Sequence, residues 1–328
     1  MSGYAIDTNT QNSKVVHINS LDATTVLQTD STSYFSFVLE ENFKCPTNQS
    51  MLISLHSATI PYSFYNIRED VNNVIPFKVQ VGSVWSSVQI QKIPKGNYSA
   101  NSLAKQIESA LTASNTGLNG DIKVTYDRST MKYLYMCNPA DHNRFTFYFD
   151  DQLNTAHIEL GFSKNALPSP IDNVGLTSEN VCDVNGNIHG IYVRTNLSLD
   201  GSYDSLTKGL STILARIPID VNFGGVLFWQ PQNGSAHKIQ IQQPYVHTIT
   251  IRLTDERNRL IDLNGLNFQV SIQFDFVYNK ESTPIPIPLR YQKPREIEET
   301  KKDQKRQRDA RIERKKRKIK SKLKRLNE

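Results

Sequence analysis

The stretch LNFQVSIQFDF, residues 266–276, carries the clearest structural signal in the chain. Apolar residues stand at every second position, from Leu266 through Val270 to Phe276, and polar residues fill the positions between them. Successive side chains of a β-strand point to opposite faces, so this alternation predicts a strand with one apolar face and one polar face. A helix would spread the same residues around its whole circumference.

A second alternating segment lies just upstream, where Ile249, Ile251 and Leu253 alternate with polar residues. The residues between the two segments, 255–265, are polar and end in an Asn-Gly pair that is typical of a turn. We therefore expect the two segments to form an antiparallel pair with one wet face and one buried face. Such a pair is not stable alone and must lay its apolar face on another sheet, which predicts a β-sandwich.

The composition is that of a folded protein with a large core, since 38% of the 328 residues are hydrophobic and 9% are aromatic. No apolar run approaches the ~18 residues that cross a bilayer, and residues 1–14 lack the apolar core of a signal peptide. The three cysteines, Cys45, Cys137 and Cys182, lack metal-ligand spacing. We therefore expect free thiols in a reducing compartment.

Charge is distributed unevenly along the chain. The formal net charge is +6, but residues 291–328 hold 17 Lys and Arg against 7 Asp and Glu, a balance of +10. The preceding residues hold 21 basic and 25 acidic residues, a balance of −4. A basic C-terminal appendage therefore follows a mildly acidic body.

Short alternating segments and turn signals predict roughly a dozen strands and one helix in the body. The helix begins after Ser99 as N-cap and carries Leu103, Ile107 and Leu111 at i, i+4 and i+8. Strands are expected near 15–20, 34–39, 51–60, 77–81, 87–93, 122–126, 132–136, 145–149, 191–194, 212–221, 225–229, 238–241, 249–253 and 266–276, with surface loops over 163–188. No β-α-β alternation is present, so we expect an all-β jelly-roll β-sandwich with an inserted β-rich subdomain that carries the helix.

The expected organisation has three parts. A jelly-roll body spans residues 1–283, with the insertion at about 85–185. Alternating prolines then favour an extended arm over 284–294. The basic tail, 295–328, contains no Pro or Gly and is rich in helix-forming residues, so we expect a helix of about 30 residues or a disordered tail.

The tail is the feature that most needs a partner. Its basic side chains are suited to attracting phosphates by counterion release. The candidate residues are Lys301, Lys302, Lys305, Arg306, Arg308, Arg311, Arg314, Lys315, Lys316, Arg317, Lys318, Lys320, Lys322, Lys324 and Arg325. Ile312, Ile319, Leu323 and Leu326 share one face, so an amphipathic helix that binds an anionic membrane or an acidic partner is a second interpretation, and a solvated solubility tail is a third.

No recognisable catalytic set is present in the sequence. It contains no Gly-rich phosphate loop, no Gly-x-Ser-x-Gly elbow and no Cys-x-x-Cys pair. The seven histidines are scattered, and the neighbouring pairs at 141–142 and 150–151 would point in opposite directions on a strand. We therefore expect a protein that is not an enzyme and that has no cofactor.

Several short motifs follow one another along the chain. They are VVHINS at 15–20, MLISLHSATIP at 51–61, IPKGNYS at 93–99, VTYD at 124–127 leading to MK at 131–132, LGF at 160–162, and the strand segments of 249–276. Their order resembles that in the penton (vertex) proteins of virophages and large eukaryotic DNA viruses, which belong to the jelly-roll capsid lineage that includes adenoviruses and tectiviruses. The resemblance covers residues 15–280 and leaves the basic tail outside it.

The resemblance implies a homopentamer that occupies the fivefold vertices of an icosahedral shell, contacts the major capsid protein and assembles in the host cytoplasm. The termini of such proteins commonly face the capsid interior, so the tail would meet genomic DNA, an internal membrane or a cement protein. The alternatives are another minor capsid (cement) protein, a jelly-roll carbohydrate-binding or attachment protein, and a metal-dependent jelly-roll enzyme of the cupin kind.

Overall fold

The computed structural model describes residues 12–28, 31–113, 122–137, 144–149, 152–233, 237–279 and 294–324, with side chains over 301–318 in the last range. The chain divides into two compact units, Met1–Tyr278 and Asn279–Glu328. The first unit contains two separate hydrophobic cores, and the second contains a single helix.

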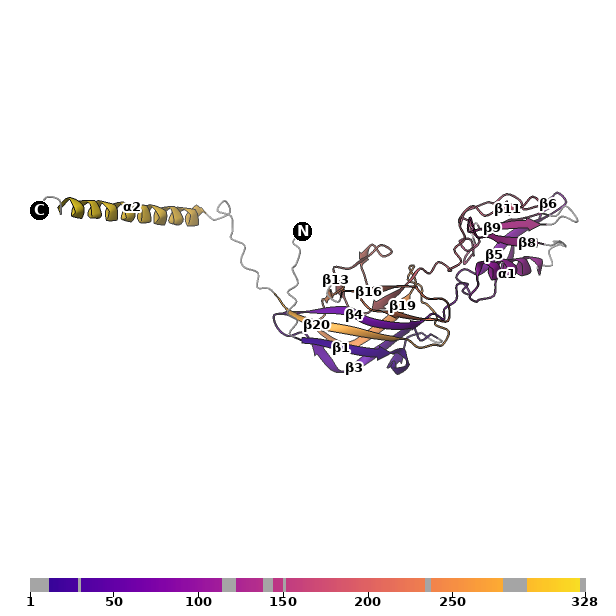
Figure 1. Ribbon diagram of the computed structural model, residues 1–328, viewed down its shortest axis with the longest axis horizontal. Coiled ribbons are helices and arrows are strands. Elements are labelled where there is room, and N and C mark those ends of the chain that lie inside the picture. The colour runs from indigo at the N-terminus through magenta and orange to yellow at the C-terminus, as the bar shows by residue number, and fades with distance from the viewer. Residues whose placement is uncertain are drawn as a thin grey trace. The chain divides into compact units, whose positions relative to one another are not determined.

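The larger core lies between two antiparallel sheets (Figure 1). In the first sheet the strand order is β1-β20-β4-β18-β13, and β17 also pairs with β4. Its strands are β1 (Asn12–Asn19), β4 (Gln49–Pro61), β13 (Leu199–Asp200), β17 (Val226–Trp229), β18 (Ile239–Ile241) and β20 (Gln269–Tyr278). The second sheet has the order β16-β12-β19-β3-β2. Its strands are β2 (Thr25–Val26), β3 (Tyr34–Lys44), β12 (Gly190–Thr195), β16 (Ile213–Pro218) and β19 (Tyr245–Thr254).

The chain crosses repeatedly from one sheet to the other. Strands β1, β4, β13 and β20 belong to the first sheet, while β3, β12, β16 and β19, which come between them in sequence, belong to the second. This wrapping is the connectivity of a jelly roll, and it confirms the all-β class expected from the sequence. A short 3-10 turn (Ser20–Asp22) and a two-stranded hairpin of β14 (Tyr203–Asp204) and β15 (Gly209–Leu210) complete this part.

The expected pairing of the two most regular segments is wrong. Strand β20 pairs with β1 and β4, whereas β19 pairs with β3 and β12, so the two face each other across the core. Ile251 and Ile272 are both fully buried in that core. Alternation shows which face of a strand is apolar but does not name its partner, and the connection at 255–265 is long enough to cross the roughly 10 Å between stacked sheets.

The expectation that the polar face of β20 is exposed to solvent is also partly wrong. Asp275 has no exposed surface, and its carboxylate lies 3.0 Å from Lys238 Nζ and accepts hydrogen bonds from Ser13 Oγ and Gln273 Nε2. Burial alone would raise the pKa of Asp275, but the hydrogen bonds from Ser13 and Gln273 and the interaction with Lys238 bring it below its ordinary value. The outward side of this central strand therefore holds a buried ion pair.

The second core is built from two small sheets and one helix. The strand orders are β10-β5-β6, with β7 beside β5, and β11-β9-β8. The elements are β5 (Val74–Val81), β6 (Val84–Trp85), β7 (Gln89–Lys92), α1 (Ala100–Thr112), β8 (Ile122–Asp127), β9 (Lys132–Cys137), β10 (Arg144–Phe147) and β11 (Leu176–Thr177). Aromatic rings fill the space between the sheets: Tyr135 meets Phe147 edge-on at 5.0 Å, and both contact Phe162.

Helix α1 matches its sequence prediction closely. The Ser99 side chain accepts a hydrogen bond from the backbone of Ser102, which caps the helix. The stripe Leu103, Ile107 and Leu111 is fully buried. The Ser99 cap thus fixes the start of the helix, and the apolar spacing fixes the face that is buried.

The residues of the second core run from Ile67 to Cys182. Strand β5 belongs to this core, which starts earlier than the expected boundary near 85. We propose residues 67–182 as the inserted subdomain and Tyr278, the last residue of β20, as the end of the jelly-roll body. The expected arm at 284–294 lies outside the described residues except for Pro294, which begins the last helix.

Candidate interaction surfaces

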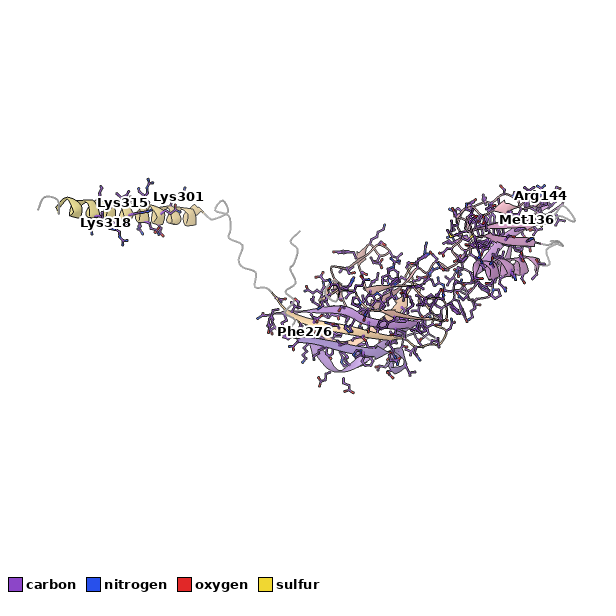
Figure 2. All side chains as sticks on the ribbon, viewed as in Figure 1. Met136, Arg144, Phe276, Lys301, Lys315 and Lys318 are labelled. Carbon is purple, nitrogen blue, oxygen red and sulfur yellow. The ribbon has the colours of Figure 1, made fainter. Side chains whose placement is uncertain are left out.

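The basic tail forms helix α2 (Pro294–Lys324). Every candidate residue from Lys301 to Lys318 lies on this helix with an exposed side chain (Figure 2). Lys320, Lys322 and Lys324 also lie on the helix, but their side chains are outside the described set, and Arg325 is outside the described residues. The long helix is the first of the two forms that the sequence allows for the tail.

The helix carries a dense positive charge. Residues 301–318 hold 11 Lys and Arg against 3 Asp and Glu, a balance of +8. Eighteen helical residues extend about 27 Å, which gives one net positive charge per ~3.4 Å. This spacing equals that of phosphates along one nucleic-acid strand, also about 3.4 Å. Two acids are engaged within the helix, Asp303 with Arg306 at 3.8 Å and Glu313 with Arg317 at 3.4 Å.

Cations surround this helix. The run RKKRK at 314–318 covers more than one turn of 3.6 residues, so its side chains leave the helix in all directions. Ile312 is the one large apolar side chain of 301–318, and 46% of its surface is exposed. Over 301–318 the helix therefore has no apolar face, and the amphipathic stripe expected from Ile319, Leu323 and Leu326 falls on side chains outside the described set.

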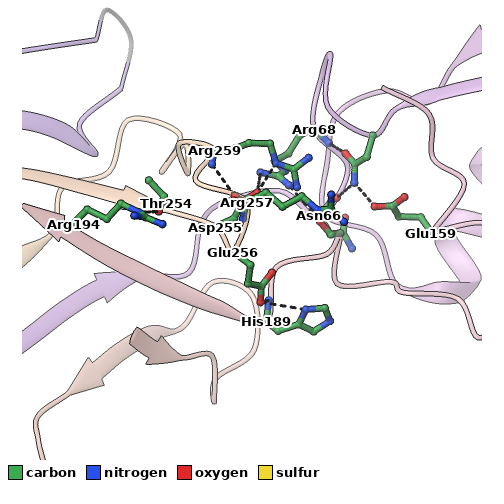
Figure 3. Close-up of polar contacts among 12 residues, drawn as sticks. Asn66, Arg68, Glu159, His189, Arg194, Thr254, Asp255, Glu256, Arg257 and Arg259 are labelled. Atoms are coloured by element: carbon green, nitrogen blue, oxygen red, sulfur yellow. Dashed lines mark hydrogen bonds and ion pairs between the residues drawn. The ribbon is translucent and has the colours of Figure 1, made fainter. Parts of the chain in front are cut away.

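A buried ion-pair network links the inserted core to the sandwich (Figure 3). Asp255, in the turn after β19, is fully buried. Its Oδ2 lies 3.2 Å from Arg68 Nη1 and 2.7 Å from Arg259 Nε, and its Oδ1 accepts hydrogen bonds from the backbone of Arg257 and Arg259. Burial and the neighbouring Arg259 lower the pKa of Arg68, while Asp255 opposes that effect. Arg68 lies just before β5, so this network joins the insertion to the β19–β20 connection.

Glu159 extends the polar contacts into the inserted core. It is only 2% exposed, and its Oε1 accepts a 2.5 Å hydrogen bond from Asn72 Nδ2. Asn72 Nδ2 also donates to the backbone oxygen of Asn66 at 2.8 Å. Burial raises the pKa of Glu159 to about 7, although Asn72 and Arg68 favour its ionised form.

The junction between the inserted core and the sandwich also requires a glycine. Gly186 has φ +67°, and a Cβ placed on it would lie 2.0 Å from the backbone oxygen of Asn66. A larger residue would therefore be strained in its own backbone and would also push the two segments apart. The Asn-Gly pair at 185–186 is thus a packing contact as well as a turn.

Described residues of the first unit line several cavities, among them three of about 310–420 Å³. One of about 400 Å³ is lined by Asn72, His157, Glu159, Lys164, Arg257 and Arg259, among others. A second, of about 420 Å³, holds Tyr62, Tyr98 and Phe223 with Asn97 and Asn222. The third, of about 310 Å³, lies around Lys78, Trp85, Tyr148 and Leu167. All three combine a few polar groups with apolar or aromatic side chains, as binding pockets do.

The described residues bring together few groups with catalytic chemistry. Over these residues no cluster of three or more His, Cys, Asp or Glu could hold a metal ion. The neighbouring pairs 141–142 and 150–151 lie outside the described residues. The three cysteines form no disulfide with one another, and burial raises the pKa of Cys137 and Cys182. No described helix has the length and apolarity needed to span a membrane.

The junction residues were not found by sequence reasoning. Arg68 and Asp255 are 187 residues apart, with Glu159 about midway between them in the sequence, and only the fold brings them together. A local signal did exist in DERNR at 255–259, where an Asp at the start of a turn has an Arg four residues later. That pattern is typical of a carboxylate that caps a turn, but it does not show that the carboxylate is buried.

Comparison with solved structures finds viral capsid proteins among those similar to this chain. No protein-family model matches the chain, and no curated protein matches it. The penton protein of mavirus is similar over 81% of this chain and 100% of its own, with 10% identity and a TM-score of 0.47. VP17, a capsid protein of bacteriophage P23-77, matches over 81% of this chain and 96% of its own, with 8% identity and a TM-score of 0.15. The first structure is a penton protein, the family that the sequence motifs resemble.

Proposed function

We propose that this chain is a structural protein of a virion and forms the penton at the fivefold vertices of an icosahedral shell. Five copies would close into a ring and contact the surrounding major capsid protein, with the basic tail facing the interior. Assembly would take place in the host cytoplasm. A closed ring gains stability because each copy is held by two neighbours, so modest individual contacts suffice.

The observation that carries this proposal is where the family motifs fall in the fold. The motif VVHINS leads from β1 into the 3-10 turn, MLISLHSATIP lies in β4, and the segments of 249–276 contain β19 and β20. These strands form the central part of a jelly-roll sandwich, an architecture used by viral capsid domains. The resemblance and the fold therefore support the same role.

The surface of the sandwich supports an assembling role as well. Among the described residues β17 pairs with β4 alone, so its other edge is open. Val226 and Phe228 on this strand are 56% and 62% exposed. An open strand edge with large apolar side chains is the kind of surface that another chain covers.

Sedimentation velocity of the full chain tests the proposal. At high micromolar concentration and in several salt concentrations, we expect a species of about five times 37.3 kDa or a larger assembly of such units. A monomer under all of these conditions would refute the penton assignment.

For the tail we propose binding to genomic DNA. Deletion of 295–328 removes the basic helix, so affinity for a 30-base-pair duplex at 50 mM salt should fall by about a hundredfold or more, because counterion release is lost. The body should remain folded, as shown by an unchanged far-ultraviolet spectrum after subtraction of the helix. Fluorescence anisotropy at several salt concentrations measures both the affinity and its salt dependence.

A charge-matched pair of variants controls for net charge. Replacing Arg314, Lys315 and Lys316 with Gln should weaken binding and flatten its salt dependence. The same change at the exposed body residues Lys105, Lys123 and Lys208 should have much less effect. Equal losses in both variants, or unchanged binding by the truncated chain, would refute the tail assignment, and binding only to anionic vesicles would move it to a membrane.

A carbohydrate-binding attachment protein is a second candidate, and the 420 Å³ cavity favours it. Tyr62 and Phe223 meet edge-on there at 5.7 Å, beside Asn97 and Asn222. Aromatic faces with amide side chains are suited to sugar rings and their hydroxyl groups. A glycan array that shows no binding at all would remove this candidate.

A further inference from the structure

The 400 Å³ cavity beside the ion-pair network has the character of an anion site. It is lined by residues 71–72, 152–155, 157–159 and Lys164 of the insertion, by residues 186–187, and by Arg257 and Arg259 of the β19–β20 connection. Asn72 and Glu159, which are 5% and 2% exposed, supply buried polar groups in its lining. The cavity is thus formed by segments that the buried Asp255 network already holds together.

The positive side chains that face this cavity form few ion pairs with acidic side chains of the described residues. Lys164 and Arg257 are exposed, and their side chains make no ion pair with another described residue. Arg259 is shared with Asp255. Burial lowers the pKa of His157, and the charges of Lys164 and Arg257 lower it further although its contact with the Thr155 backbone opposes this. Positive charge from two parts of the chain therefore converges on one imidazole.

The remaining lining suits hydroxyl groups. Side-chain amides come from Gln152, Asn154 and Asn187, and an amide can offer both donors and an acceptor. Asn72 also lines the cavity, but its amide is engaged with Asn66, Glu159 and the backbone N–H of Arg68. His157 Nδ1 is engaged with Thr155 Oγ1 at 2.7 Å and Thr155 O at 3.2 Å. Its other ring nitrogen, Nε2, has no partner among the described residues and donates a hydrogen bond when the ring is protonated.

We propose that this cavity binds a small polyol that carries a phosphate or sulfate group. Lys164, Arg257 and His157 hold the tetrahedral oxyanion, and the amides with Glu159 hold the hydroxyl groups. The volume lies in the range of small-molecule sites, and it leaves room for a carrier beside the oxyanion. Binding would join the insertion to the sandwich at a second point, independently of the role of the chain in a capsid.

The proposal has a defined pH dependence. Glu159 faces Asn72, Arg68 and Asp183, and His157 faces Lys164, Arg257 and the ring of Phe149. As pH falls through about 7, Glu159 becomes neutral and stops repelling an anion. His157 adds a positive charge only at a lower pH, because its pKa is lowered from the ordinary value. Affinity should therefore increase from pH 8 to pH 6.

Isothermal titration of the full chain with glucose 6-phosphate, inorganic phosphate, inorganic sulfate and glucose tests this site. We expect saturable binding of glucose 6-phosphate, weaker binding of both inorganic ions, and none of glucose. The double variant Lys164→Gln, Arg257→Gln should bind glucose 6-phosphate at least tenfold more weakly. The matched variant Lys105→Gln, Lys123→Gln removes two exposed charges elsewhere in the insertion and should bind normally.

A second readout does not depend on any substitution. In the wild-type chain, saturation with glucose 6-phosphate should raise the pKa of the His157 ring, as followed by the ring proton shifts in NMR. Equal losses in the two double variants would overturn the site, because binding would then follow net charge and not these two side chains. Unchanged binding by both variants, or an unmoved His157, would overturn it as well. Inorganic phosphate that binds as tightly as the sugar phosphate would overturn the assignment of a polyol carrier.

Discussion

The two hydrophobic cores of the body are built in different ways. The sandwich core is mainly aliphatic. In the first of its two sheets β1 pairs with β20, so Asn12 near the start of the chain lies opposite Phe276 near the end of the body. The core of the insertion is rich in Tyr and Phe and draws all its residues from one continuous part of the chain, 67–182. The sandwich therefore requires both ends of the body before it can close, whereas the insertion is assembled from local contacts.

In our proposals, the sandwich provides the surface for assembly, and the insertion provides most of the ligand cavity. The motifs at 15–20, 51–61 and 249–276 and an open strand edge lie on the sandwich, while the insertion holds the remaining motifs and contributes most of the lining of the anion cavity. The buried Asp255 network connects the two parts. The following variants test how far the two cores are independent, in order of decreasing expected effect.

Truncation of one buried ring in each core should have the largest effect. Phe274→Ala in β20 and Phe147→Ala in β10 each remove a side chain with at most 1% exposure, and each should cost about 3–5 kcal/mol of stability. Hydrogen exchange should show lost protection over β4, β19 and β20 for the first variant. For the second it should show lost protection over β5, β9 and β10. Equal loss over both regions in both variants would show a single cooperative core.

Breaking the network should be nearly as costly. Asp255→Ala leaves the largely buried Arg68 without its partner and should destabilise the chain by about 3–5 kcal/mol in urea unfolding. The control is Asp70→Ala, which breaks an exposed pair with Lys92 and should cost less than about 1 kcal/mol. Similar small costs for both variants would contradict a structural role for the junction.

Glu159 should give the junction a pH dependence. Its pKa is raised from 4.5 to about 7 by burial, so the folded chain retains a proton that the unfolded chain releases. The associated stability is fully present below pH 4.5 and is lost as pH rises through 7, by about 3 kcal/mol in total. Unfolding of wild type and Glu159→Gln from pH 4 to 8 measures the difference, and parallel curves would contradict the buried acid.

Assembly should depend on the sandwich more than on the insertion. Phe228→Ser removes an exposed apolar side chain beside the open edge of β17, and the dissociation constant of the oligomer should rise about tenfold, or ~1.4 kcal/mol. Val84→Ser makes the same kind of change at an exposed position of β6 and should leave assembly unchanged. Analytical ultracentrifugation distinguishes the two, and the reverse pattern would place the interface on the insertion.

Local sequence patterns predicted the longer strands and helix α1, but they did not predict the two-residue strands β2, β6, β11, β13, β14 and β15. Alternation predicts β4, β19 and β20, and the stripe from Leu103 to Leu111 predicts α1. Each of these signals depends only on which residues share a face of one strand or helix.

Such patterns could not predict which strands pair with each other, or which distant side chains the fold brings together. The partners of β19 and β20 depend on how the chain crosses between the two sheets. The buried carboxylate of Asp275 forms an ion pair with Lys238, which lies directly before β18. Arg68, Glu159 and Asp255 meet only when the insertion has folded. The charge of the tail was evident from composition, because a run of cations such as 314–318 needs no tertiary contact to be recognised.

Negative-stain electron microscopy of the purified full chain tests the central claim most directly. We expect class averages of closed rings with five sandwich bodies around one axis, or larger particles built from such rings. Isolated single bodies, or open chains that do not close, at high micromolar concentration would contradict the vertex assignment.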